Sequence, residues 1–186
     1  EMPESLPEPD MLGQLPQVLE SYRLVSHGLR GKAALVCNLE GPVTKAALLR
    51  GMENLAMDME LQPDLAHEVV RFAIEQGKLF IEGVSEASSP DAVFFASATD
   101  NPDILGIENV MRHSIPGLRS LVAKARSLDM LTVFHPHGDL SHDRNADLLE
   151  AMLASGIDGF QFAEGNDAVK IRETLRERVC IMGGID

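Results

Sequence analysis

Short apolar runs alternate along this chain with longer segments in which apolar residues recur at helical spacing. The longest helical segment follows Pro63, where Leu65, Val69 and Phe72 repeat on one face and the apolar pattern continues to Val84. The short continuous apolar runs are typical of buried β-strands. They predict five strands, at residues 33–37, 91–97, 131–135, 158–164 and 179–183.

The segments between these strands predict further helices. Helices are expected at residues 17–22, 44–49, 54–60, 118–128, 143–155 and from 167 to about 178. Residues 104–112 fit either a helix or an irregular segment, and Pro116-Gly117 predicts a break in the chain. Residues 1–16 are rich in proline and glutamate and predict a loose N-terminal segment.

Strands that alternate with helices of this length predict a parallel sheet with crossover helices. The strands are continuously apolar, which indicates that both faces of the sheet are covered. A doubly wound sheet and a (β/α)₈ barrel both fit, but the first strand lacks the glycine motif of dinucleotide-binding folds. A complete barrel takes about 250 residues. We therefore expect a partial α/β barrel over residues 32–186 after an N-terminal segment of residues 1–31, with barrel missing at one or both ends.

The excess of acidic side chains limits the classes of partner. The chain has 29 acidic and 16 basic residues, a net charge of −13. A surface of this charge repels nucleic acid and anionic membranes, so we expect neither as a partner. No apolar run approaches the roughly 20 residues of a membrane-spanning helix. Both cysteines lie in apolar stretches, which predicts free thiols in a reducing compartment and therefore a cytoplasmic protein.

The strongest candidate for chemistry is the sequence His135-Pro136-His137-Gly138, which directly follows the third predicted strand. The carboxyl ends of the strands form the active-site face of an α/β barrel. Two imidazoles two residues apart could converge there on one ion, and neutral imidazole suits zinc. Nearby acidic and imidazole groups, on Asp139, His142 and Asp143, could add contacts around such an ion. The alternative is a hydrogen-bonded histidine pair that only shapes a turn.

Other polar residues and glycines also follow predicted strands and are expected at the same rim. They are Asn38, Glu40, Gly41, Ser97, Asp100, Glu164 and Gly184. Glu164 could be a metal ligand, a general base or a helix cap, and Gly184 could offer backbone amides to an anion or only allow close packing. Two further histidines are weaker candidates, because His67 fits a helix surface and His113 fits a turn.

Several motifs, in their order and spacing over about residues 35–186, resemble the uroporphyrinogen decarboxylase superfamily. They are GPVTKAALLRG (41–51), QPDLAHEVV (62–70), the block that ends in LTVFHPHGD (131–139), LLEAMLASGIDGFQF (148–162) and VCIMGGID (179–186). The resemblance implies a (β/α)₈ barrel enzyme. It also implies one of two activities: decarboxylation of the acetate arms of uroporphyrinogen, or zinc-assisted methyl transfer between a corrinoid and a thiol such as coenzyme M.

The motifs depart from both branches of the superfamily. The methyltransferases use a His-x-Cys pair and a later cysteine, and His137 stands where the first of these cysteines would be. The decarboxylases carry a serine after the second strand, which Ser97 matches, but Ala96 replaces the acidic residue often found before it. The arginine motif of the decarboxylases would fall before Glu1.

The interpretation we favour is methyl transfer, with His135 and His137 as zinc ligands and Glu164 as a third ligand or an orienting acid. Ser97 and Glu164 are assigned to catalysis. Substrate contacts are assigned to Asn38, Glu40, Gly41, Asp100 and Gly184. The expected partners are a small-molecule substrate, a corrinoid protein and a second copy of the chain. Porphyrinogen decarboxylation without a cofactor is the alternative, and a non-catalytic relative is a further one, because histidine replaces cysteine at position 137.

Overall fold

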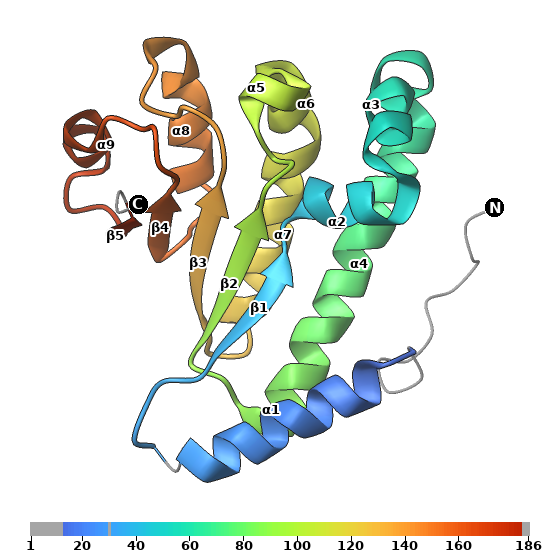
Figure 1. Cartoon of the computed structure of the whole chain (residues 1–186), viewed down its shortest axis with the longest axis vertical. Helices are drawn as coiled ribbons and strands as arrows, with labels where there is room; N and C mark the ends of the chain where they lie inside the picture. The colour runs from blue at the N-terminus through green and yellow to red at the C-terminus, as the bar shows by residue number, and fades with distance from the viewer. Residues whose placement is uncertain (1–12, 30, 184–186) are drawn as a thin grey trace.

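A five-stranded parallel sheet forms the centre of the protein (Figure 1). The computed structural model describes residues 13–29 and 31–183. The strands lie in chain order: β1 (Val36–Glu40), β2 (Ala92–Ser97), β3 (Leu131–Pro136), β4 (Gly159–Phe162) and β5 (Cys180–Gly183). All four neighbouring pairs are parallel, so the prediction of five adjacent parallel strands is confirmed.

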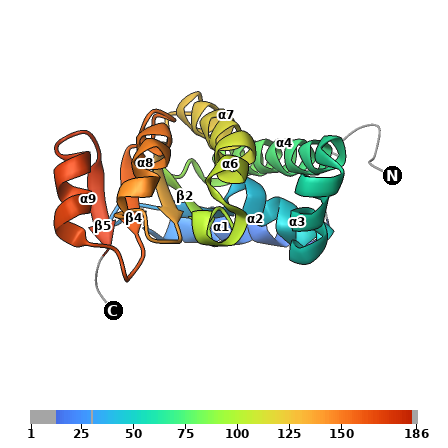
Figure 2. The same cartoon turned by 90° about the horizontal axis from the view of Figure 1, so that it is seen from above.

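Helices connect successive strands, as parallel pairing requires. The connecting helices are α2 (Pro42–Arg50), α3 (Met52–Leu61), α4 (Pro63–Ser88), α5 (Pro102–Leu105), α6 (Ile107–Asn109), α7 (Ile115–Arg126), α8 (Ala146–Leu153) and α9 (Ala168–Leu175), and α1 (Leu15–Leu29) precedes the first strand. A π-helical turn at Val110–Ser114 joins α6 to α7, and a 3₁₀ turn at Asp143–Asn145 leads into α8. Seen from above, α4, α7 and α8 lie on one side of the sheet (Figure 2).

The hydrophobic core lies between these helices and one face of the sheet. Strand register aligns Leu39, Phe95, Phe134 and Phe160 in a single row across four strands. None of these side chains is more than 6% exposed. Because an aromatic side chain buries a large apolar area, this row contributes much of the stability of the sheet.

The opposite face of the sheet is open among the described residues. The side chains of Asn38, Phe94 and Val133 share a row on this face and are exposed or half-buried. Leu131, two residues before Val133 on the same face of β3, is 59% exposed. The expectation that both faces are covered therefore holds for one face only in the described part of the chain. We call the uncovered side the open face.

Three sequence-based boundaries were wrong. The first strand begins at Val36, three residues later than predicted, and continues to Glu40. Pro116 and Gly117 do not break the chain, because they lie in the first turn of α7, where the missing N–H of proline costs nothing. The first helix is longer than residues 17–22 and reaches Leu29.

The two edges of the sheet do not pair with each other within the described residues. Helix α1 crosses α4 near the amino ends of the strands (Figure 1) and approaches the edge strand β1. The hydroxyl of Tyr22 accepts a hydrogen bond of 3.2 Å from the N–H of Asn38 there. None of the described helices is both long enough and apolar enough to span a membrane.

Candidate functional site

His135 is the second-last residue of β3, and its imidazole lies on the open face. Its Nδ1 lies 3.1 Å from the backbone carbonyl oxygen of Gln161 on the neighbouring strand β4. A carbonyl can only accept, so Nδ1 carries the proton and Nε2 keeps its lone pair. This is the usual way in which a protein fixes the tautomer of a metal-binding histidine.

The Nε2 atoms of His135 and His137 lie 3.1 Å apart. The two rings meet edge to face, with centroids 4.8 Å apart and an interplanar angle of 74°. Because Nε2 of His135 keeps its lone pair, the Nε2–H of His137 donates to it. Burial is the main effect on the pKa of His135 and lowers it, and the nearby His137 lowers it further. The hydrogen bond to Gln161 and the charge of Glu164 act in the opposite direction and raise this pKa. The predicted pair therefore converges on one point and does not face two separate environments.

The turn after His135 is fixed by contacts to loops on both sides. The N–H of His137 donates to the carbonyl of Ser97, at 3.3 Å. Gly138 has a φ of +96°, and a Cβ at this position would lie 2.5 Å from Oδ1 of Asn101. Its carbonyl accepts from Nδ2 of Asn166, at 3.0 Å. Glycine is therefore required here both by its backbone angle and by the close approach of the β2–α5 loop.

The polar residues that follow this turn bond to each other and to the loop. The carboxylate of Asp139 accepts from the hydroxyl and the N–H of Ser141, and the hydroxyl bond is the main cause of its lowered pKa. Nδ1 of His142 accepts from the N–H of Arg144. Asp143 is 91% exposed and faces Lys170. These contacts shape the loop, and none of them points these groups at the histidine pair.

Ser97 and Gly41 meet on the covered side of the sheet. Ser97 is fully buried, and its hydroxyl has no hydrogen-bond partner among the described residues. Ala96 pairs in register with His135, so their side chains lie on the same face of the sheet. Ser97 is the next residue after Ala96, and its side chain therefore lies on the opposite face. A Cβ on Gly41 would lie 1.6 Å from Oγ of Ser97, so a glycine is needed there for packing. The structure does not bring Ser97 together with the histidine pair.

Asp100 is fully buried and anchors helix α2. Its carboxylate accepts from the N–H of Val43, the N–H of Thr44 and the hydroxyl of Thr44, at 3.2, 3.2 and 3.0 Å. These N–H groups are in the first turn of α2, where a helix has unsatisfied donors and favours negative charge. The predicted substrate contact would require this carboxylate to leave all three donors.

Three other predicted residues lie at differing distances from the histidine pair. Glu40 shares an open-face row with Ala96 and His135, two strands away, which corresponds to about 10 Å. Asn38 lies one row below, beside Phe94. Glu164 is exposed just after β4. Gly184 lies outside the described residues.

Sequence reasoning missed two features. One is the pair of contacts that holds His135, made by the Gln161 carbonyl and the ring of Phe94. These residues are on neighbouring strands, so the contacts depend on strand register, which the sequence does not specify. The other is His113, predicted as a turn residue. It is 4% exposed within the π-helical turn, and neither ring nitrogen has a partner among the described residues. Burial lowers its pKa, with smaller effects from His67 and Arg112.

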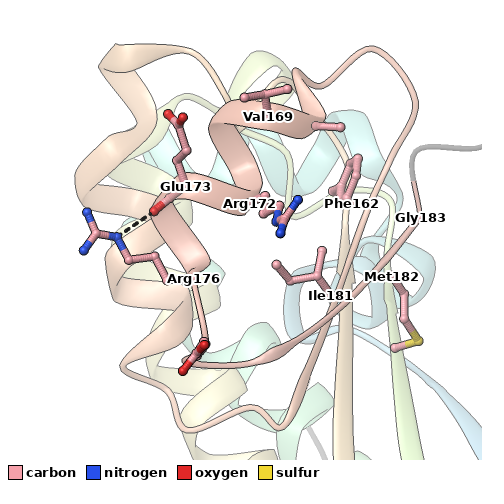
Figure 3. Close-up of a pocket in the computed structure, with 10 residues that line it drawn as sticks. Phe162, Val169, Arg172, Glu173, Arg176, Ile181, Met182 and Gly183 are labelled. Atoms are coloured by element: carbon pink, nitrogen blue, oxygen red, sulfur yellow. Dashed lines mark hydrogen bonds between the residues drawn. The ribbon is translucent and has the colours of Figure 1, made fainter.

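A groove of about 1020 Å³ lies apart from the histidine pair, between α9 and β5. Figure 3 shows the side chain of Arg172 beside Phe162 and Ile181 in this groove. Neither His135 nor His137 lines it. Within the part of the chain that the structure describes, no group of three or more histidine, cysteine or acidic side chains could hold a metal ion.

Comparisons with known proteins agree with this fold and with the resemblance in the motifs. A methylated-thiol–coenzyme M methyltransferase of Methanosarcina mazei is 26% identical over 99% of this chain and 48% of its own length. The methylcobamide:CoM methyltransferase MtaA of Methanosarcina barkeri is 23% identical over 92% of this chain and 48% of its own. The chain thus spans about half the length of these curated relatives.

A solved structure of a methyltransferase from Methanosarcina mazei has the same fold. It superposes with a TM-score of 0.79 at 23% identity, over 92% of this chain and 49% of the other. The described sheet is therefore part of a barrel of this type, as the sequence predicted. The family model for uroporphyrinogen decarboxylase (URO-D) matches residues 1–186. The chain belongs to the uroporphyrinogen decarboxylase family.

Proposed function

We propose that this chain is part of an enzyme that transfers a methyl group between a corrinoid and a thiol, with His135 and His137 as ligands of a zinc ion. The observation that carries the proposal is the convergence of the two Nε2 atoms, 3.1 Å apart, at the carboxyl rim of the sheet. The names of the relatives add support, because they describe methyltransferases of methylcobamide, methylated thiols and coenzyme M.

The two imidazoles fit two of the four ligand positions of a zinc ion. Two nitrogens at 2.0–2.1 Å from one tetrahedral ion are about 3.3–3.4 Å apart, close to the separation of the two Nε2 atoms. Burial favours the neutral form of His135, which is the form that coordinates. His137 replaces the cysteine of the family motif and offers nitrogen in place of sulfur, which zinc also accepts. Glu164 is exposed after β4 and does not form a three-ligand group with the two histidines. It would therefore act as an orienting acid, and a third ligand would come from outside the described residues.

The other residues on the open face would handle the substrate. When bound, zinc lowers the pKa of a thiol and so supplies a thiolate nucleophile. Asn38 and Glu40 present polar groups on the same face as His135 and would contact the thiol substrate. Phe94 and Val133 offer an apolar surface that limits water near the pair. A corrinoid protein would approach from the carboxyl rim. We also expect a cytoplasmic homodimer.

The test is a methyl-transfer assay on the full-length protein with methylcobalamin and coenzyme M. Replacement of either imidazole, in His135→Ala or His137→Phe, should lower the rate at least 100-fold. His137→Cys restores the family's ligand type and should remain active. His27→Ala, on the exposed surface of α1, is the matched control and should behave as wild type. Carbon dioxide release from uroporphyrinogen, with no methyl transfer, would instead favour the decarboxylase.

A further inference from the structure

The ring of Phe94 stacks on the imidazole of His135. Their centroids are 5.8 Å apart and the ring planes differ by 25°. Phe94 is on β2, where it pairs in register with Val133, and Ala96 pairs with His135. Phe94 is therefore the diagonal neighbour of His135 on the open face, a position from which an aromatic side chain can reach across the strands.

The small side chain of Ala96 leaves this space to the phenyl ring. Ala96 stands directly beside His135, and its methyl group does not extend over the imidazole. No described helix packs on the open face, so the orientation of the imidazole depends on contacts within the sheet. Phe94 is itself only half-buried, although it has the size of the core aromatics.

Two contacts together determine where Nε2 of His135 points. The hydrogen bond from Nδ1 to the Gln161 carbonyl fixes one atom of the ring but leaves the plane free to turn about that bond. The stacked phenyl ring fixes the plane. With both restraints, Nε2 is held facing Nε2 of His137. Loss of either restraint would let the ring tilt away from the shared point.

We infer that Phe94 is a positioning residue that holds His135 in its ion-binding orientation. The inference rests on the proposed function, because it takes the histidine pair as the ion site. Phe94 itself touches no ion. Partners that orient a ligand typically change metal affinity 10- to 100-fold when they are removed.

The experiment compares three variants of the full-length protein with wild type. Phe94→Leu keeps apolar volume on a half-exposed position but removes the stack, and Phe94→Tyr keeps the ring. Val36→Ala removes apolar surface from the open face on β1, in register with Ala92 and away from the stack. Zinc affinity is measured by competition with a chromophoric chelator. Phe94→Leu should bind zinc at least about tenfold more weakly, whereas Phe94→Tyr and Val36→Ala should stay within about threefold of wild type.

A second readout separates this inference from the proposed function. Nitrogen NMR of the histidine side chains without added metal can detect the scalar coupling across the hydrogen bond between Nε2 of His137 and Nε2 of His135. Wild type should show this coupling, and Phe94→Leu should lose it because the imidazole of His135 tilts away. If wild type binds no zinc, the proposed function fails and the NMR comparison alone decides the role of Phe94. Either wild-type zinc affinity or a retained coupling in Phe94→Leu would overturn the inference.

Discussion

Replacement of Asp100 tests how the rim of the sheet is built. Its fully buried carboxylate accepts three hydrogen bonds from Val43 and Thr44 at the start of α2. Each bond to a charged group contributes about 1.5–3 kcal/mol, and loss of a helix cap costs about 0.5–2 kcal/mol. These contributions overlap, so we expect Asp100→Ala to lower the free energy of unfolding by about 3 kcal/mol. That is a large share of the stability of a typical domain.

The assay is urea unfolding followed by circular dichroism, with linear extrapolation to water. Asp100→Asn keeps one acceptor oxygen and should lose about 1–2 kcal/mol, which provides a measurement if the alanine variant does not fold. The control is Asp143→Ala, whose exposed carboxylate should contribute less than about 0.5 kcal/mol. The anchoring role is refuted if Asp100→Ala is no more destabilising than the control. Loss of substrate binding in Asp100→Asn at unchanged stability would favour the substrate contact that the sequence suggested.

Three further predictions use the same protein. Gly41→Ala should destabilise it by about 2–3 kcal/mol in urea unfolding, because the new methyl group collides with a buried hydroxyl. Gly28→Ala, in helix α1, meets nothing within 4 Å and should be neutral or slightly stabilising. Burial lowers the pKa of His113 below its usual value, so the unfolded chain takes up the proton first and stability falls as the pH drops below about 6.5. His113→Leu should reduce this acid-side loss, and an unchanged pH profile would contradict the assignment. With a thiol reagent at pH 8, the exposed Cys180 should react quickly, but Cys37, buried and with its pKa raised to about 11, should react only after denaturation.

The order of the strands was predictable from the chain, but the position of the first strand was not. Its boundary was placed by the apolar run at residues 33–37, which stops at the polar Asn38. In the structure, Asn38 and Glu40 belong to β1 because their side chains leave the sheet on the open face, where no described helix excludes water. A strand with one uncovered face carries polar side chains at alternate positions, so its first polar residue does not mark its end.

The convergence of the histidine pair was predictable to a similar extent. The spacing of His135 and His137 at the end of a strand indicated that the two imidazoles could converge, and their Nε2 atoms do. The contacts that orient His135 come from neighbouring strands and depend on register, which the residues of one strand do not specify. The same is true of Asp100, whose position after β2 was clear but whose contact with the start of α2 arises only from the fold.

If His135 and His137 jointly bind a metal ion, elemental analysis of the full-length protein should detect it. The protein is purified without a chelator as wild type, His135→Ala and His137→Ala. We expect about one equivalent of zinc per chain in wild type and little in either variant. Wild type without stoichiometric metal, or variants that retain the metal of wild type, would contradict this expectation.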